Sequence, residues 1–233
     1  MFQTDPFSLI LLFVGLSLLP FVAMVATSYL KIVVVMSLIR NALGIQSIPP
    51  NMVINALAMI LSLYIMAPVA SESWTIAKEE LAKVQQPAAS QTPQTSQTSQ
   101  TSRFFETDAV VKASEPFRKF LSDHTAVRER AFFVHTAETL WGKDGKPAVV
   151  DHESFYILLP SFCVSELTKA FQIGFLVYLP FIAIDIIVSN ILLAMGMMMV
   201  SPVTISLPFK LLLFVMVNGW TLLIQGLVRG YML

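Results

Sequence analysis

The sequence has little charge, and most of that charge is confined to one part of the chain. Only 13% of its 233 residues are Asp, Glu, Lys or Arg, against about 25% in a typical soluble domain, while 55% are hydrophobic. Eight charged residues remain outside positions 72–153, too few to solvate the surface of a globular protein. The two ends of the chain are therefore expected to be solvated by a lipid bilayer.

The sequence also lacks the features of several other protein classes. Its net charge is zero, so nothing indicates electrostatic binding to nucleic acid. Its single cysteine, Cys163, cannot form a disulfide within the chain. No basic residue precedes Pro6, so the first apolar stretch is expected to be a retained helix and not a cleaved secretory signal.

No sequence pattern typical of an enzyme site is present. There is no phosphate-binding glycine loop, no GxSxG and no HExxH. His124, His135 and His152 have no cysteine or acidic partner at zinc-ligand spacing, so they are expected to be solvated surface residues. The sequence gives no reason to propose an enzyme, a cofactor or a metal, and a membrane enzyme is the weakest functional alternative.

Two apolar runs make up the N-terminal third of the chain. Ser8–Leu30 carries no charge and is long enough to cross about 30 Å of hydrocarbon as a helix, with Pro20 expected to kink it. Met52–Ala70 is the second run, and a turn over 31–51 separates the two. Residues 1–70 are therefore predicted to form an apolar helical hairpin.

Residues 71–154 differ in composition and are predicted to form a polar domain. Residues 85–102 are rich in Gln, Thr and Ser and have no aliphatic side chain larger than alanine, so they are expected to be a disordered linker. Between Glu106 and Trp141, charged and apolar residues alternate at helical spacing. This pattern predicts two amphipathic helices separated near Ser122–His124.

Residues 155–233 are again apolar and are predicted to form a second helical hairpin. Phe171–Val200 contains one charge, Asp185, and the break at Ser201–Pro202 separates this run from the uncharged span Leu211–Val228. By hydropathy the chain is thus an all-α membrane protein with about four transmembrane segments. They form two apolar helical hairpins that flank the polar, partly disordered helical domain.

The basic residues near short loops predict the orientation in the membrane. Lys31 and Arg40 lie in the turn of the first hairpin, which should therefore be cytoplasmic. The polar domain, residues 71–154, is then expected on the outer face of the membrane, which in a bacterium is the periplasm.

Six charged residues lie inside the apolar thirds, where a charge near the bilayer centre is energetically costly and usually faces a partner or water. These candidates for pairing between helices or subunits are Lys31, Arg40, Glu166, Lys169, Asp185 and Lys210. Glu166 and Lys169 are three positions apart and can pair on one helix face. Snorkelling to the membrane surface is the simpler interpretation for Lys31 and Lys210, near segment ends. Asp185, in mid-segment, is expected to have a partner on another helix or subunit.

A cluster of methionines follows the third apolar segment. Met195, Met197, Met198 and Met199 surround one glycine and precede Ser201–Pro202. They are either apolar filler at a helix end or a deformable ring, since methionine is unbranched and repacks against many shapes at low cost. Repeated around an oligomeric axis, such a loop would seal a pore and still yield to a passing chain.

Two stretches carry long and specific motifs. Thr27–Asn51 reads TSYLKIVVVMSLIRNALGIQSIPPN, and Ala170–Phe214 contains YLPF, then Asp185, MGMMM and Ser-Pro. These stretches closely resemble the FliP/SctR family, core membrane proteins of the export apparatus of bacterial flagella and type III secretion injectisomes. The resemblance covers roughly residues 1–75 and 155–230. The absence of a cleavable signal resembles the injectisome branch more than the flagellar one.

The resemblance implies a structural, pore-forming component of the type III export gate in the bacterial inner membrane, through which unfolded secreted proteins pass. It implies a homo-pentamer assembled with small helical-hairpin subunits and one larger related subunit, in contact with membrane lipid. It also implies that Met197, Met198 and Met199 line the narrowest part of the pore as a gasket. The alternative is a small-molecule or ion transporter, which also has broken helices and charges at mid-membrane.

Overall fold

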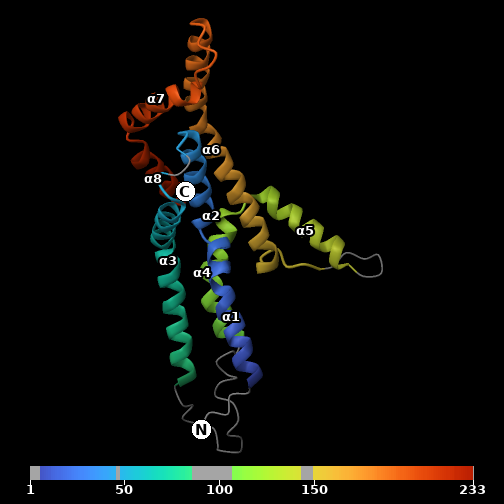
Figure 1. The fold of residues 1–233 in the computed structure, drawn as a ribbon. Helices are drawn as coiled ribbons and strands as arrows, with labels where there is room; N and C mark the ends of the chain where they lie inside the picture. The colour runs from blue at the N-terminus through green and yellow to red at the C-terminus, as the bar shows by residue number, and fades with distance from the viewer. Residues whose placement is uncertain (1–5, 46–47, 86–106, 143–148, 233) are drawn as a thin grey trace, which may run out of the picture.

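The computed structural model describes residues 6–45, 48–85, 107–142 and 149–232. These residues form eight helices and contain no strand, which confirms the predicted all-helical fold. In chain order the helices are α1 (Pro6–Val25), α2 (Tyr29–Ala42), α3 (Asn51–Gln85), α4 (Thr107–His124), α5 (Val127–Trp141), α6 (Phe155–Ala194), α7 (Pro202–Met216) and α8 (Gly219–Arg229). Figure 1 shows an elongated bundle with α6 along much of its length and α5 projecting to one side.

Two of the described helices are individually long and apolar enough to cross a membrane. They are α3, over Asn51–Glu80, and α6 over its whole length. Two further pairs, α1 with α2 and α7 with α8, pass the same test only when each bent pair is taken as one span, which gives up to four spans. The chain therefore has the membrane character that its composition predicts, but the breaks lie elsewhere than expected.

The first predicted span, Ser8–Leu30, is wrong as a single helix, because α1 and α2 are bent by 56° at the break between them. Thr27 Oγ1 donates to the Ala23 carbonyl at 2.7 Å and accepts a hydrogen bond from Ser62 Oγ of α3 at 3.1 Å. Ser28 Oγ also donates to Ser62 Oγ, at 3.2 Å. Side-chain hydroxyls that bond in this way compete with the helical backbone ladder, and here they also hold the bend against α3.

The helix α3 runs without interruption from Asn51 to Gln85, although it contains Pro68. The predicted boundary at residue 70 thus lies inside a helix, because the polar residues that follow are strong helix formers and pack against α4. Gln85, expected to begin the disordered linker, is the last residue of α3. The rest of the predicted linker lies outside the described residues.

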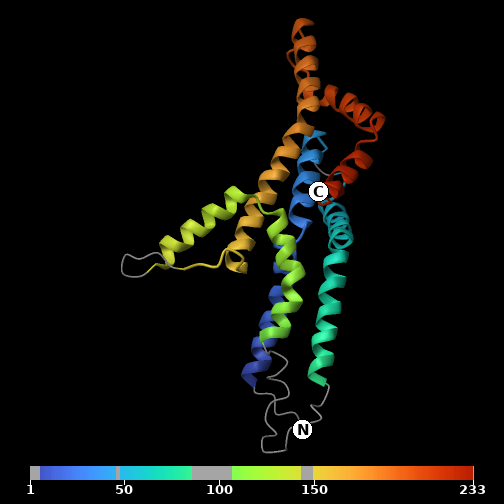
Figure 2. The same ribbon diagram turned by 180° about the vertical axis from the view of Figure 1, so that it is seen from behind.

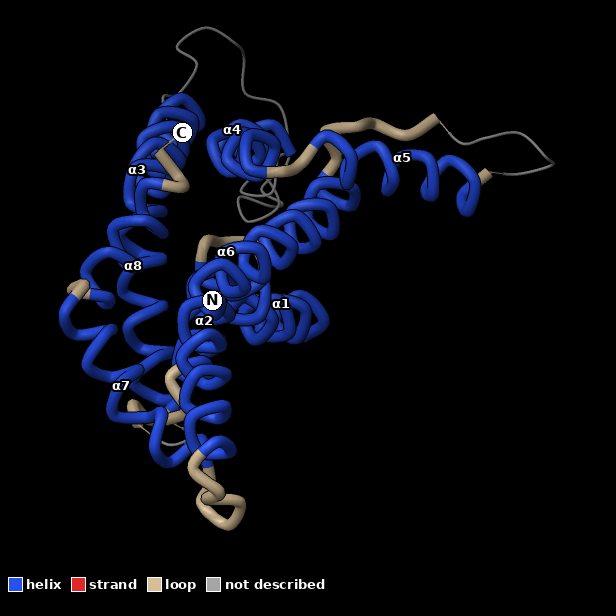
Figure 3. Tube along the Cα trace, turned by 90° about the horizontal axis from the view of Figure 1, so that it is seen from above, coloured by secondary structure: helices blue, strands red, loops and turns tan. Residues whose placement is uncertain are grey.

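The polar middle of the chain contains α4 and α5, separated at Thr125–Ala126. Two helices were predicted here with a break close to this point. Ser165 of α6 accounts for the position of the corner, since its Oγ accepts a hydrogen bond from the Ala126 amide at 3.0 Å. From this corner α5 leaves the bundle axis, as the view from above shows (Figure 3).

The longest helix, α6, joins the two parts that the sequence places at 155–162 and 171–200. It spans 40 residues with Pro160 and Pro180 inside it, which at about 1.5 Å per residue makes it about 60 Å long. That is twice the roughly 30 Å of bilayer hydrocarbon. Figure 2 shows the same helix from behind, with α2 alongside it. Gly174 permits this approach, because a Cβ there would lie 2.3 Å from Leu38 Cδ1 of α2.

The last predicted span, Leu211–Val228, is also broken, since α7 and α8 are bent by 59°. Asn218 has a φ of 51°, in the left-handed region that asparagine tolerates better than most residues. A Cβ on Gly219 would lie 2.3 Å from the Phe214 ring, so glycine permits the chain to turn closely around that side chain.

Candidate functional site

Glu166 is the centre of a buried polar cluster, formed with Lys31, Lys169 and Tyr231 and called here the Glu166 cluster. Lys31 Nζ lies 3.0 Å from Glu166 Oε2, and Lys169 Nζ lies 3.1 Å from Oε1. The Tyr231 hydroxyl donates a hydrogen bond to Oε2. The Lys31 and Glu166 side chains are 3% and 0% exposed, so this pair is shielded from solvent, whereas the Lys169 side chain is 40% exposed at the edge of the cluster.

The helices explain why these side chains meet. Glu166 and Lys169 are one turn apart on α6, so they share a face, while Lys31 comes from α2, which packs along that face. Lys31 therefore pairs within the fold and does not snorkel to a membrane surface. Because both Glu166 oxygens already accept from donors, this carboxylate is poorly suited to act as a general base.

Aromatic rings enclose the cluster. Lys31 Nζ lies 3.5 Å from the centroid of the Tyr231 ring, a cation–π contact, and the His124 ring of α4 lies 5.1 Å from the same ring. Lys169 Nζ also donates to the His124 carbonyl at 2.7 Å. Burial and the neighbouring Glu166 carboxylate raise the pKa of the Tyr231 phenol above its ordinary value, so the hydroxyl stays protonated and donates.

A second cluster, the Asp185 cluster, consists of Asp185, Ser206 and Lys210 and joins α6 to α7. Lys210 Nζ lies 2.5 Å from Asp185 Oδ2, and Ser206 Oγ donates to Oδ1 at 2.5 Å. Lys210 Nζ also donates to the Ala42 carbonyl at the end of α2, at 3.4 Å. Lys210 is buried and thus does not snorkel, whereas the Asp185 side chain is 34% exposed.

Arg40 belongs to neither cluster. Its Nη1 donates to the Pro49 carbonyl at 3.4 Å and to Asn51 Oδ1, so it closes the turn between α2 and α3. Its Nε is buried without a hydrogen-bond partner among the described atoms. Of the six charged candidates, five thus lie in the two clusters and one holds a turn.

The methionine turn, residues Met195–Val200, follows α6 at the end of the molecule farthest from α1 (Figure 1). Gly196 has a φ of +73° and ends the helix in a Schellman motif: its amide donates to Leu193, and the Met197 amide donates to Leu192, both at 3.0 Å. The apolar segment expected to reach Val200 as helix thus ends at Ala194. The glycine fixes the backbone of the turn.

All four methionines of the turn are exposed. The exposed fraction is 63% for Met195, 44% for Met197 and 82% for Met198, and Met199 is fully exposed. Exposed apolar patches of this kind are typical of interaction sites.

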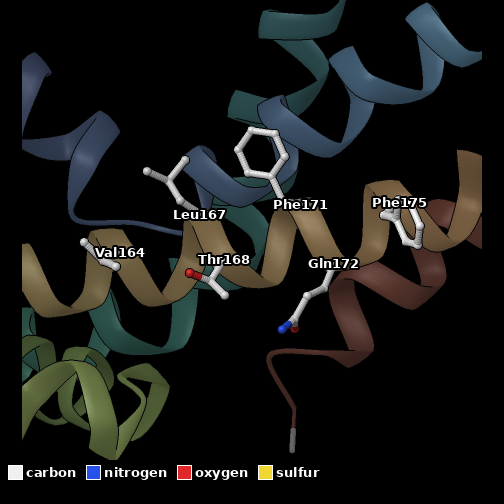
Figure 4. A pocket seen from close by; sticks show the side chains of 6 residues that line it. All are labelled: Val164, Leu167, Thr168, Phe171, Gln172 and Phe175. Atoms are coloured by element: carbon white, nitrogen blue, oxygen red, sulfur yellow. The ribbon is translucent and has the colours of Figure 1, made fainter.

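A further apolar surface lies on α6 itself. Six side chains at helical spacing line a shallow pocket of about 520 Å³, shown in Figure 4: Val164, Leu167, Thr168, Phe171, Gln172 and Phe175. Phe171 and Phe175 are largely exposed, as are most described side chains of α1. The fold thus neutralises its internal charges but leaves long apolar faces uncovered.

The three histidines differ in exposure. His124 is half-buried against Phe120 and Tyr231, so the expectation of a solvated surface residue is wrong for it, whereas His135 and His152 are exposed. Within the parts of the chain that the structure describes, no three His, Cys, Asp or Glu side chains gather as metal ligands.

Two polar residues of the clusters were missed by the sequence reasoning. Ser206 lies one turn before Lys210 on α7, so its spacing could have pointed to a shared partner. Tyr231 gave no such signal, because it lies 65 positions from Glu166 and outside every expected apolar span.

Comparison with known proteins matches residues 11–227 to the FliP family. The "Yop proteins translocation protein R" of Yersinia pestis is 49% identical over 230 residues, which cover 97% of each chain. The "Hypersensitivity response secretion protein HrcR" of Ralstonia nicotianae is 47% identical, over 96% of each chain. The "Flagellar biosynthetic protein FliP" of Bacillus subtilis is 39% identical, over 96% of this chain and 90% of its own. The likeness covers both apolar thirds and the polar region between them, and the chain belongs to the FliP family.

Proposed function

We propose that this chain is a structural, pore-forming subunit of the type III protein export gate in the bacterial inner membrane, through which unfolded secreted proteins pass. The observation that carries the proposal is 49% identity, over 97% of both chains, to a protein named for the translocation of Yop proteins. The apolar helices and the absence of enzyme motifs from the sequence agree with a non-enzymatic membrane component.

The subunit works as part of an oligomer: a homo-pentamer with small hairpin subunits and one larger related subunit. The exposed apolar surfaces of α1, α6 and the methionine turn support this assembly, because lipid or neighbouring helices must cover them. The two charged clusters already satisfy their own polar groups, so each subunit can present an apolar exterior to its neighbours.

The methionine turn forms the gasket of the pore. Its backbone is fixed by Gly196, while Met197, Met198 and Met199 project freely and can repack around an axis. Such a rim excludes water at rest and yields to a chain in transit.

The polar domain, residues 71–154, lies on the periplasmic side. Arg40 is the basic residue that supports this orientation, because it holds the turn between α2 and α3. Lys31 gives no such support, since it is buried in the Glu166 cluster.

A small-molecule or ion transporter is less favoured. That alternative drew on broken helices and on charges at mid-membrane. Bent helix pairs are present, but Asp185 is neutralised by Lys210 and accepts a hydrogen bond from Ser206. The relatives are also named for protein translocation or secretion.

The decisive experiment is to express the chain with its operon neighbours, purify it in detergent and measure the mass of the intact particle by native mass spectrometry. The proposed function predicts a large hetero-oligomer that contains several copies of this chain. A monomer or a simple homodimer under these conditions contradicts it.

Replacing Asp185 by alanine is expected to reduce the amount of high-mass complex on native gels. The substitution leaves the buried Lys210 ammonium without its counterion. Removing one partner of a fully buried ion pair lowers stability by about 3–5 kcal/mol. The loss here should be smaller, because the Asp185 side chain is one-third exposed. Asp123→Ala, at an exposed position, is the matched control. Normal complex levels with lost secretion would instead indicate a gating or ion-coupling role.

A further inference from the structure

The helix α8 lies over an open space and is not packed flat against the bundle. Between α6 and the α7–α8 pair is an apolar groove of about 580 Å³, lined from both sides. A Cβ on Gly226, which lines this groove, would meet no heavy atom within 4 Å. Within α8 only Leu223 and Leu227 are buried, and Trp220 and Ile224 pack against the core while partly exposed.

The joint between α7 and α8 has the features of a hinge. Asn218 is in the left-handed conformation, and the residues at 217–218 separate two helices bent by 59°. Hinges are a few residues at element ends that absorb changes of φ and ψ. Rotation at this joint would move α8 relative to α7 without breaking either helix.

At its far end α8 is held by one side chain. The backbone continues for a turn, with the Tyr231 amide donating to the Val228 carbonyl at 3.1 Å, and this places Tyr231 inside the bundle. There its hydroxyl donates to Glu166 of α6, its ring covers Lys31 of α2, and the same ring stacks 6.1 Å from Phe120 of α4. One residue thus joins α8 to three other helices.

We propose that α8 is a hinged strap, which turns about Asn218 and is locked over the apolar groove by insertion of Tyr231 into the Glu166 cluster. The closed position is favoured because withdrawing Tyr231 breaks a hydrogen bond to a charged, buried carboxylate. With Tyr231 withdrawn, α8 keeps only apolar contacts, those of Trp220, Leu223, Ile224 and Leu227, and the groove opens. This inference rests on contacts within the chain and does not depend on the proposed export function.

The test compares Tyr231→Ala, which removes hydroxyl and ring, with Tyr231→Phe, which keeps the ring. Met232→Ala, at the exposed next position, is the control. Hydrogen–deuterium exchange of the full-length protein purified in detergent should rise about tenfold or more across α8 in the alanine variant, as loss of a hydrogen bond to a charged group predicts. The phenylalanine variant should show a smaller rise, and the control none.

Maleimide labelling of single cysteines in α8 provides a second test that does not require the alanine variant to fold stably. In a Cys163→Ser background, Leu227→Cys places a buried thiol under the strap and Gln225→Cys an exposed one. Tyr231→Phe should speed maleimide labelling at position 227 several-fold and leave position 225 unchanged. Equal labelling at 227 with and without the hydroxyl, or a uniform rise of exchange over α2, α6 and α8, would overturn the strap.

Discussion

Replacing Glu166 by glutamine is expected to remove most of the folded subunit from the membrane, the largest stability effect of any single substitution considered. Glutamine keeps the shape of the side chain but leaves the buried Lys31 ammonium without a counterion. Breaking a buried pair by removing one partner costs about 3–5 kcal/mol, a large share of the roughly 5–15 kcal/mol that stabilises a typical domain. Subunit levels in isolated membranes and the thermal unfolding of purified complex measure the loss.

A matched control and a rescue variant make this prediction specific. Glu153→Gln removes the same charge at an exposed position just before α6 and should leave both readouts unchanged. Lys31→Met combined with Glu166→Gln removes the stranded cation as well, and should recover much of the lost protein, because an apolar replacement of a buried pair is often neutral. If Glu166→Gln behaves like Glu153→Gln, the cluster does not stabilise the fold.

Replacing Met197, Met198 and Met199 together by alanine is expected to make the closed export gate leak. The turn keeps its backbone, since Gly196 is untouched, but loses most of the volume that fills the pore axis. The seal consists of many dispersion contacts of about 0.1–0.2 kcal/mol each, so it depends directly on that volume. Complex assembly should be retained, and the uptake of small ions or dyes by intact cells should rise several-fold.

Two further variants test whether the methionines of the turn seal the pore or only fill space. Alanine at Met24, Met59 and Met216, which are exposed on other helices, removes the same volume elsewhere and should cause no leak. Isoleucine at the three turn positions should restore sealing better than secretion, because it fills space but repacks less readily. A triple-alanine variant that assembles, secretes normally and shows no added permeability would refute the gasket.

Local features of the fold were predicted where the signal lies within one or two turns of chain. The break between α4 and α5 is predicted near Ser122–His124, just before its observed position at Thr125–Ala126. The spacing of Glu166 and Lys169 places them on one helix face. Hydropathy likewise gave the membrane character of both ends. These signals need no knowledge of which helices become neighbours.

The features that were missed depend on partners far away in the sequence. The bend before Tyr29 involves Ser62 of another helix, and the bend at Asn218 lies hidden within an apolar run. The sequence suggests an interfacial position for Lys31, because its counterion, Glu166, is on a helix that comes much later. Periodicity identifies the face of a helix that is buried, but not the residue that faces it.

The Glu166 cluster gathers parts of the chain that are synthesised at different times. Lys31 belongs to α2, Glu166 to α6, and Tyr231 follows the last described helix. A nascent chain therefore carries an uncompensated cation in an apolar helix until α6 has left the ribosome, and such a segment partitions poorly into lipid. A chain truncated before Glu166 stays in that condition and remains open to membrane proteases. Burial of one ammonium group thus distinguishes chains that have formed α6 from those that have not, before any assembly begins.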